Sequence, residues 1–509
     1  MNKILSILIL TFGVSIASQA ATTPPVGCTY DQYGRKADGS TLWATTDQGI
    51  PTAQRPPFET NCLIDQFIYN NFLYLTSDDG NGHPKFMSML PWYNLLPAQG
   101  APVWTGKYAS LNGTKLNKTG NKIQAGDAFE LLDVNNQVAS YDMRVNQVFF
   151  DYVQSNKAYT QDTLNKLAAA FKENSYANGV WLPPTSMGSK DLGAIEIKTS
   201  WRNFGTADTK LCPSDIMHCE VDDKQNVWGL VGVHLVQKTN THGEFVWATF
   251  EHIANSPDCT AGGSNSIAQY PTDPTDSSKT INVNKYYQDG AQNTGWNYFD
   301  YNNYKKIGGD GSSCAIPTQN GASPICLTSP AGATKGSWKR VEVCRTDILE
   351  SVKNGCAALN GQESNGQDIA CLNNSIVSNS PSPIASKWKY YKLVGMEWAA
   401  NGNTEGGGFP QGCFTLDGAN ESGPCPNFKH TGESGSAPKY RRTGSTTMAN
   451  TTMETWMQNG VYLSTSSGPI TGTDCFGCHQ PQTIAFPPSK SSGAFNQGDM
   501  SHIFSRIRQ

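Results

Sequence analysis

Five residues near the C-terminal end of the chain have the types and spacing that attach a haem covalently. They read Cys475-Phe476-Gly477-Cys478-His479, the C-x-x-C-H pattern. One helical turn lets both thiols form thioethers on one porphyrin edge, and the next residue offers its imidazole to the iron. The pattern predicts one covalent haem c, bound through Cys475 and Cys478, with His479 as the iron ligand. The alternative is a redox Cys-x-x-Cys pair that merely precedes a histidine.

The position of this motif says which part of the chain must surround it. Only 30 residues follow His479, whereas class I cytochrome c domains carry the motif near their start and a distal methionine well after it. The polypeptide upstream must therefore build most of the pocket, and Ile503 and Phe504 are expected to pack on the haem.

The sixth iron ligand stays open, and with it the choice between an electron carrier and a site that binds small molecules. For Met453 and Met457 we favour core packing of a helix over ligation. Five-coordinate and six-coordinate iron remain equally compatible with the sequence. The candidates are Met500 and His502 after the motif, and His430, Met448, Met453 and Met457 before it.

Predicted strands further upstream carry ionisable side chains that alternate with apolar ones. Period-2 alternation puts each such set on one face of a sheet. If that face lines a haem pocket, Arg202 and Lys238 are the best propionate partners, and His234 or His252 the best distal acid–base group. The simpler interpretation, which we favour, is a solvated face with cross-strand ion pairs.

These residues need an antiparallel sheet to position them. β-branched and aromatic runs predict strands over residues 194–202, 227–238, 244–252 and 388–398, with a turn at 239–243. Helical spacing predicts a helix near Cys62, a second over 162–176 with Asp162 as N-cap, and a third over 446–458. The expected fold is α+β and β-rich: a central antiparallel sheet with peripheral helices, long disulfide-held loops and a C-terminal haem c segment.

Composition shifts along the chain predict four regions. They are a signal peptide (1–20), an N-terminal region with helices (21–190), a β-rich core with long loops (191–400) and a C-terminal haem c-binding segment (401–509).

The N-terminus has the features of a secretory signal. Lys3 precedes a short apolar run at 4–16, and Ser18-Gln19-Ala20 predicts cleavage after Ala20. The protein is therefore expected in the periplasm or outside the cell, where c-type haem is attached. No later apolar stretch is long enough to span a membrane. A net charge of -4 without long runs of one sign disfavours nucleic acid or an anionic membrane surface as a partner.

The cysteine count agrees with export. Of 14 cysteines, those outside the haem motif form an even set that allows up to six disulfides. Plausible local pairs are Cys212 with Cys219, Cys314 with Cys326, and Cys413 with Cys425. A zinc site that includes Cys212, His218 and Cys219 is the weaker alternative, because no second pair of ligands lies nearby.

Four segments resemble large, uncharacterised bacterial mono-haem proteins of the cytochrome c family. They are residues 196–202 (EIKTSWR), 231–239 (VGVHLVQKT), 247–252 (WATFEH) and 449–456 (ANTTMETW). The resemblance implies haem c binding and export, without a defined reaction. Residues 498–507 also look like the tail of the β-sheet cytochromes related to cytochrome c-prime-beta, which would imply a sheet-built pocket with an open distal side.

Three functions compete at this stage. Electron transfer with a redox partner protein or small molecule is the most favoured. The alternative is a haem enzyme, or a protein that binds peroxide- or NO-type molecules at an open distal site. A third is a secreted binding or structural protein that uses haem only for stability. An ionisable strand face that points toward the haem would favour a haem enzyme or small-molecule binding. A face that points toward solvent would favour electron transfer or a binding protein.

Overall fold

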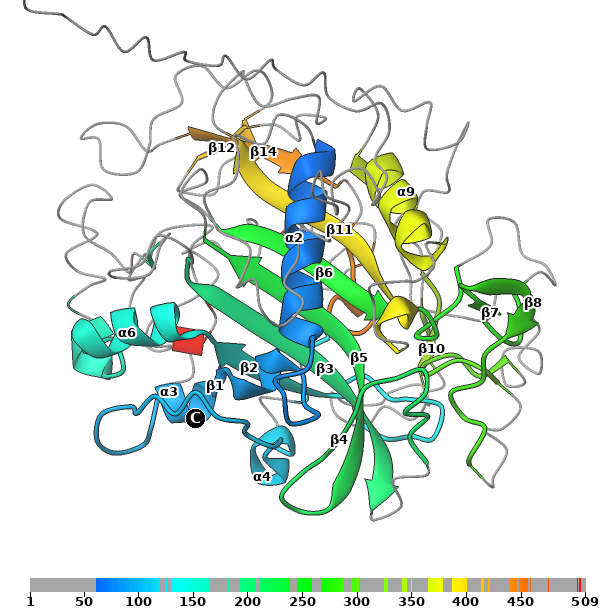
Figure 1. Cartoon of the computed structure of the whole chain (residues 1–509), viewed down its shortest axis with the longest axis horizontal. Helices are drawn as coiled ribbons and strands as arrows, with labels where there is room; N and C mark the ends of the chain where they lie inside the picture. Colours follow the sequence, from blue (N-terminus) through cyan, green and yellow to red (C-terminus); the bar gives the residue numbers. More distant parts are fainter. Residues whose placement is uncertain are drawn as a thin grey trace, which may run out of the picture.

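A ten-stranded antiparallel sheet runs through the protein, with helices packed across one face (Figure 1). The computed structural model describes residues 61–118, 122, 124–125, 130–164, 166, 182–183, 193–206, 211–238, 245–258, 267–287, 294–301, 325–327, 341–345, 349, 365–378, 387–400, 413–415, 420–421, 439–445, 448–455, 458, 475, 501 and 503–504. The predicted signal peptide lies outside these residues.

The strand order in the sheet is β1-β2-β3-β5-β6-β11-β14-β12-β13, and β4 pairs with β5. Its strands are β1 (Leu90–Pro91), β2 (Ser140–Val145), β3 (Ile195–Thr206), β4 (Cys219–Val221), β5 (Asn226–Gln237), β6 (Val246–His252), β11 (Tyr391–Ala400), β12 (Cys413–Thr415), β13 (Asn420–Glu421) and β14 (Lys439–Gly444). Two small hairpins lie apart from it: β7 (Thr272–Asp273) with β8 (Asp276–Thr280), and β9 (Ile325–Leu327) with β10 (Val341–Val343).

The helices are mostly short. They are α2 (Asn61–Thr76), α3 (Trp92–Leu95), α4 (Gly113–Leu116), α6 (Gln147–Ser155) and α9 (Asn365–Ser378), with 3-10 turns η1 (Lys85–Ser88) and η4 (Trp388–Tyr390). Asn146 caps α6, because its side chain accepts the backbone N–H of Phe149. The predicted helix near Cys62 is confirmed as α2.

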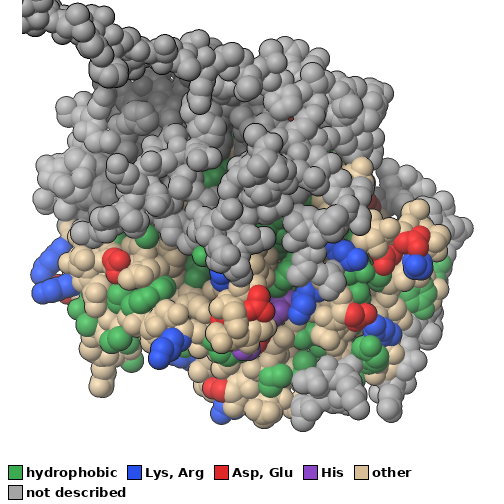
Figure 2. All heavy atoms as spheres, viewed as in Figure 1, with side chains coloured by type: hydrophobic (Ala, Val, Ile, Leu, Met, Phe, Trp, Pro, Cys, Tyr) green, Lys and Arg blue, Asp and Glu red, His purple; other side chains and the backbone are tan. Residues whose placement is uncertain are grey.

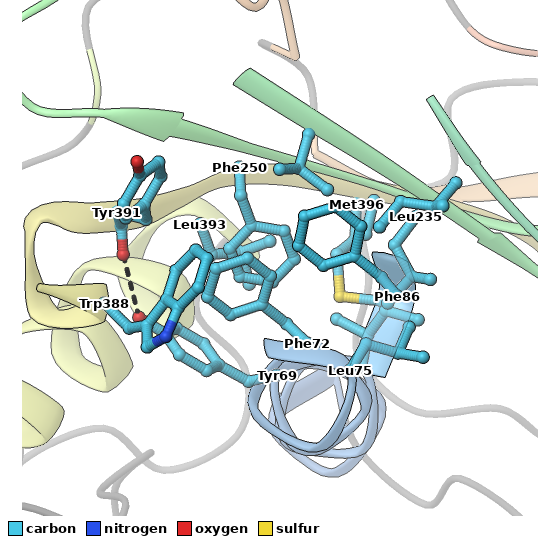
Figure 3. Packing of buried hydrophobic residues seen from close by; sticks show 14 of the residues in the cluster. Tyr69, Phe72, Leu75, Phe86, Leu235, Phe250, Trp388, Tyr391, Leu393 and Met396 are labelled. Carbon is cyan, nitrogen blue, oxygen red and sulfur yellow. Dashed lines mark hydrogen bonds between the residues drawn. The ribbon is translucent and has the colours of Figure 1, made fainter. Parts of the chain in front are cut away.

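One face of the sheet, here called the helix-covered face, is apolar and packs against α2 and α9. Leu235, Ala248 and Met396 are in register across β5, β6 and β11 and point to this side. Aromatic rings from α2 meet them there: Phe72 stacks on Phe250 at a centroid distance of 4.1 Å (Figure 3). In Figure 1, α2 crosses these strands. Burial of such large rings is the main hydrophobic contribution to the fold.

The opposite face, here called the turn-covered face, carries the polar residues of the same strands. Residues 449–455 lie against one part of it, and residues 503–504 join α6 and α3 in the apolar cluster at the end that carries Val236 and Trp247. Every residue of β6 is buried, as expected of a central strand covered on both sides. The predicted alternation is therefore confirmed, but the favoured interpretation of a solvated face is wrong.

Strand prediction succeeded for the central strands, and the antiparallel pairing of β5 with β6 is confirmed. The turn at 239–243 lies outside the described residues. The predicted strand at 388–398 begins with the 3-10 turn η4 before β11 starts. The predicted α+β, β-rich class with a central antiparallel sheet is confirmed. Strands from all three predicted regions after residue 20 share the one sheet, and the division into those regions stays a prediction.

Two predicted helix features are wrong. The Thr160 hydroxyl, not Asp162, accepts the N–H of Thr163, so the helical residues 161–164 are capped two residues earlier. Most of the predicted helix at 162–176 lies outside the described residues. Within 446–458, residues 448–450 have no regular secondary structure, residues 451–453 form a turn, and 3-10 geometry occurs only at Thr455 and Gln458 among the described residues. Threonine and asparagine have low helix propensity, and their side chains find partners on the sheet instead.

The face seen in Figure 2 shows no large region of one charge among the described residues. Lysine and arginine are interspersed with aspartate and glutamate over the face seen in Figure 2. Among the described residues, no helix combines the length and apolar character that a membrane crossing requires.

A buried polar network holds one end of the sheet. Arg202 is fully buried and donates to three acceptors: Asp133 at 2.6 Å, Asn297 at 2.7 Å and Asn284 at 2.6 Å. Asp133 in turn accepts the backbone N–H groups of residues 135 and 137. All of these groups would be costly to leave unpaired.

The Asp133→Asn variant should unfold at a lower urea concentration, with a loss of about 3–5 kcal/mol, because it leaves the Arg202 charge buried without its counter-ion. The matched control is Asp162→Asn, which alters an exposed ion pair with Lys166 and should leave the urea midpoint unchanged. Equal midpoints for Asp133→Asn and wild type would contradict this account.

Candidate functional site

Cys475, the first residue of the predicted haem motif, lies against the turn-covered face. Its backbone N–H donates to Glu397 Oε2 at 2.7 Å. Glu397 lies in β11, is 1% exposed and is in register with Trp247 of β6. The Cys475 side chain is half-buried and packs on a cluster that contains Trp247 and Val236. This end of the face thus orients the first motif residue through a buried carboxylate.

The last described residues of the chain join the same cluster. Ile503 and Phe504 are fully buried there, and Phe504 stacks with Phe149 of α6 at a centroid distance of 5.8 Å. In Figure 1 the red C-terminal segment lies beside α6 and β2. Residues on both sides of the haem motif therefore meet at one apolar wall. Whether Ile503 and Phe504 also touch a haem stays a prediction.

Residues 449–455, here called the docked turn, are attached to the same face by polar contacts. Tyr141 donates its hydroxyl to the backbone carbonyl of Thr452 at 2.5 Å, and the Thr452 hydroxyl lies 2.6 Å from that of Ser200. Asn450 Nδ2 donates to Thr249 Oγ1 and to the carbonyl of Phe250. The segment that precedes the haem motif is thus held through donors and acceptors on β2, β3 and β6.

Gly232 allows this close approach. A Cβ at this position would lie 2.5 Å from Thr452 Oγ1 and 2.6 Å from Ser200 Oγ. The space above β5 is taken by the docked turn, so a side chain there would displace it.

Glu251 of β6 is the charged centre of the contact. It pairs with Arg345, lies 3.6 Å from Lys392 Nζ, and accepts both the backbone N–H and the hydroxyl of Thr451. Arg345 also donates to the carbonyl of Ala449 at 2.9 Å. Burial alone raises the pKa of Glu251, but these cations and the Thr451 donors together hold that pKa below its ordinary value.

His234 of β5 reaches the docked turn from the sheet. Its Nε2 lies 3.2 Å from Glu454 Oε2, and that oxygen also accepts the backbone N–H of Asn450 at 3.0 Å. Lys198 of β3 and Thr249 of β6 are in register with His234 on either side. Of the two histidines proposed as acid–base groups, this one lies on the same face as Cys475.

His252 does not lie there, so its prediction as a distal group is wrong. It is the neighbour of Glu251 in β6 and points to the opposite, helix-covered side, fully buried against Tyr391. Its Nε2 lies 2.9 Å from the carbonyl of Ile216, and the N–H of Ala254 donates to Nδ1. Burial lowers the pKa of His252 to about 4, so it is neutral in the folded protein at pH 7.

Arg202 is not available to a propionate, because Asp133, Asn284 and Asn297 take its donors. It also lies six residues along β3 from Glu196, roughly 20 Å from the end of the face that meets Cys475. Lys238 fits better. Its ammonium lies 5.3 Å from the ring centroid of Phe245, which belongs to the cluster that Cys475 contacts.

Of the candidates for the sixth iron ligand, only Met453 and Met448 lie among the described residues. Met453 is 2% exposed and packs in a cluster different from the one that Cys475 contacts, so core packing is confirmed for it. Met448 is half-buried. Met457, Met500, His430 and His502 lie outside the described residues, as do Cys478 and His479.

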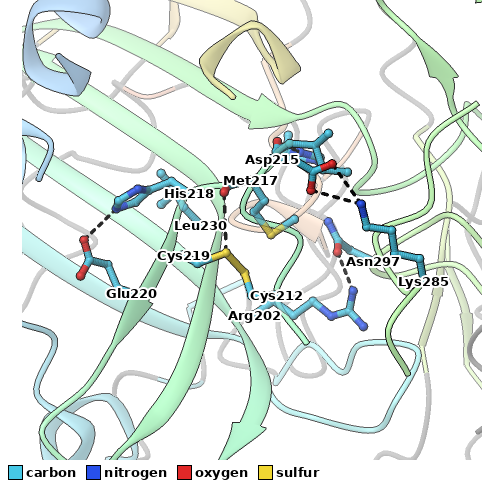
Figure 4. Close-up of a disulfide and its surroundings, with 12 residues drawn as sticks. Arg202, Cys212, Asp215, Met217, His218, Cys219, Glu220, Leu230, Lys285 and Asn297 are labelled. Carbon is cyan, nitrogen blue, oxygen red and sulfur yellow. Dashed lines mark hydrogen bonds and ion pairs between the residues drawn. A yellow bond between two sulfur atoms is a disulfide. The ribbon is translucent and has the colours of Figure 1, made fainter. Parts of the chain in front are cut away.

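A disulfide replaces the alternative zinc site. Cys212 and Cys219 are bonded to each other, so neither thiolate is available to a metal. His218 Nε2 pairs with Glu220 at 2.9 Å (Figure 4), and no metal-binding group of three acids, histidines or cysteines occurs among the described residues. Cys344 and Cys371 are also disulfide-bonded. The other two predicted pairs, Cys314 with Cys326 and Cys413 with Cys425, involve side chains outside the described set.

Sequence reasoning missed the residues that anchor the motif and the docked turn. Glu397 and Arg345 gave no local signal, because their partners are more than 75 residues away along the chain. Glu251 falls within the predicted strand at 244–252, but alternation did not identify it as a buried charge. An acidic residue within the continuous strand at 246–252 was the available hint, since a charge on a central strand needs a buried partner.

Comparison of the chain with protein families, with curated proteins and with solved structures finds no match. The site must therefore be interpreted from its own residues.

The neutral state of His252 predicts a pH effect on stability. Its pKa is depressed in the folded state, so its contribution is complete above about pH 6.5 and is lost as pH falls toward 4. Over that window the loss should be roughly 3 kcal/mol. Urea unfolding at several pH values should show a clearly smaller loss in His252→Gln, and identical pH profiles would refute the assignment.

Glu251→Gln should destabilise the protein by about 3–5 kcal/mol at pH 7, since Arg345 and Lys392 lose their shared counter-charge. Because the pKa of Glu251 is lowered on folding, the wild-type advantage is present above about pH 4.3 and disappears as pH falls through the folded-state value. Urea titrations at pH 7 and at successively lower pH values measure both. A wild-type advantage that does not shrink at any pH below about 4.3 would contradict the ionised state.

Proposed function

We propose that this protein is an exported mono-haem c-type cytochrome with a redox role, most directly electron transfer. The observation that carries the proposal is the place of Cys475. The first cysteine of a C-x-x-C-H motif is held by a backbone hydrogen bond to a buried carboxylate, beside an aromatic cluster on a rigid sheet.

The residues at this place fit the group. Thioether attachment needs thiols on a fixed backbone, and Glu397 fixes the backbone at Cys475. Trp247, Phe245 and Phe504 offer an apolar wall of the kind that excludes water from a porphyrin. Lys238 lies beside that wall and offers a cation for a propionate. Cys478 would complete the covalent attachment, and His479 would ligate the iron.

When bound, such a haem supplies one-electron chemistry at a potential set by its ligands and by the polarity around it. The chain contributes a dry wall and a fixed backbone, which keep reorganisation small when an electron arrives or leaves. The partner is a redox protein or a small redox-active molecule. Neither nucleic acid nor a membrane is proposed as a partner.

One observation favours a second function, a haem enzyme or a protein that binds peroxide- or NO-type molecules. The ionisable face of β5 points toward the side where Cys475 packs, not away from it. His234 and Glu454 are a partly accessible acid–base pair on that face, which a simple electron carrier does not need.

Expression with a c-haem attachment system should give a mature chain with one covalent haem, seen as a mass increase that survives denaturation. The double variant Cys475→Ala/Cys478→Ala should lose it, because both thioethers are removed. Asp162→Asn serves as an expression control. A wild-type chain without covalent haem would overturn the proposal.

The same holoprotein separates the two functions. A ferrous spectrum unchanged by CO indicates a six-coordinate electron carrier, whereas rapid CO and NO binding to a high-spin iron indicates the alternative.

A further inference from the structure

His234 and Glu454 differ in exposure from the buried pair of Glu251 and Arg345 on the turn-covered face. The side chains of Glu251 and Arg345 are 2% and 0% exposed, whereas those of His234 and Glu454 are 20% and 24% exposed. The buried pair can only stabilise the fold. The partly exposed pair can exchange protons with solvent while it is still held in position.

The pair is held on both sides. His234 is fixed by β5, a central strand, and Glu454 by the docked turn, where its Oε2 also accepts the backbone N–H of Asn450. Asn450 is itself bonded to Thr249 Oγ1 at 3.0 Å. Since Glu454 accepts at Nε2 of His234, the other ring nitrogen, Nδ1, is the one left to take or release a proton.

The sheet register places this pair close to Cys475. Val236 and Trp247 are in register with each other, and Trp247 with Glu397, which binds the Cys475 backbone. His234 lies two residues along β5 from Val236, on the same face. With strands about 4.8 Å apart and a rise of about 3.3 Å per residue, His234 is roughly 12 Å from Glu397.

Other charged groups surround the pair, and each would influence its protonation. On the same face, β3 carries Lys198 and Glu196, β2 carries Tyr141, β6 carries Glu251, and β11 carries Lys392 and Glu397. Glu251 and Lys392 already interact with each other.

We propose that His234, oriented by Glu454, is a proton site linked to the redox state of the haem. This inference rests on the proposed function. When a reduced partner delivers one electron, the centre loses one positive charge, and Nδ1 of His234 takes one proton from solvent. On oxidation the electron leaves to an acceptor, and the proton returns to solvent. The charge of the site is thereby the same in both states.

The test is the midpoint potential of the holoprotein, measured by spectroelectrochemistry from pH 5 to pH 9. In the wild type the potential should fall as pH rises through the range where imidazoles titrate, by up to about 59 mV per pH unit, the one-electron value for a tenfold change in proton activity. In His234→Gln, which keeps a donor toward Glu454, this slope should disappear.

Glu454→Gln is the second variant. It removes the charge that favours the imidazolium, so the sloping region should move to lower pH without vanishing. His83→Gln is the matched control, because His83 stacks on Tyr108, away from the docked turn; it should keep the wild-type slope. The melting temperature and haem mass of each variant are recorded alongside.

The outcomes separate the two proposals. A wild-type chain that lacks covalent haem overturns the proposed function. A haem-loaded wild type with a flat profile, or a His234→Gln variant with an unchanged slope, overturns the proton site and leaves the function standing. If His234→Gln does not fold, an unchanged profile in Glu454→Gln overturns the proton site instead.

Discussion

The buried carboxylate of Glu251 is the group on which the arrangement of the C-terminal residues depends. A carboxylate buried on a central strand is stable only if cations and donors surround it. Arg345, Lys392 and Thr451 supply them from three distant parts of the chain. The folded state therefore requires the docked turn to lie on the sheet, because its absence would leave Glu251 and Arg345 short of partners.

The two faces of the sheet hold their covering segments by different means. The helix-covered face uses apolar area, which is strong but tolerates small shifts of α2 or α9. The part of the turn-covered face beneath the docked turn uses directional hydrogen bonds, each of which fixes a distance and an angle. Directional contacts suit a site in which Glu454 must meet His234 and Glu397 must meet the backbone of Cys475. The polar face thus gives the precision that redox or acid–base chemistry needs.

The central strands could be predicted from the sequence because their signal is local. Alternation within residues 227–238 correctly set His234 opposite Val233 and Leu235, and within residues 244–252 it set Glu251 opposite Phe250. The predicted helix at 446–458 failed because the side chains of Asn450, Thr451 and Thr452 bond to strands more than 190 residues away. Tertiary hydrogen bonds of this kind override the weak helix propensity of such a segment.

The assignment of Arg202 and His252 to a pocket failed for a related reason. Alternation says which face a side chain points to, but not what covers that face or which end of it is near the motif. Arg202 is bound by Asp133, and His252 by the carbonyl of Ile216. Neither partner is close in sequence.

The sequence by itself determined the chemistry that the chain can offer and the periodicity of its strands. The C-x-x-C-H spacing and the period-2 alternation both depend on bond geometry over a few residues. Only the tertiary structure decided which charged groups are buried in ion pairs and hydrogen bonds, and which stay partly exposed on the face that Cys475 contacts. Burial and pairing are set by contacts between residues far apart in the chain, and these determine the protonation of Glu251 and His252 and the accessibility of His234.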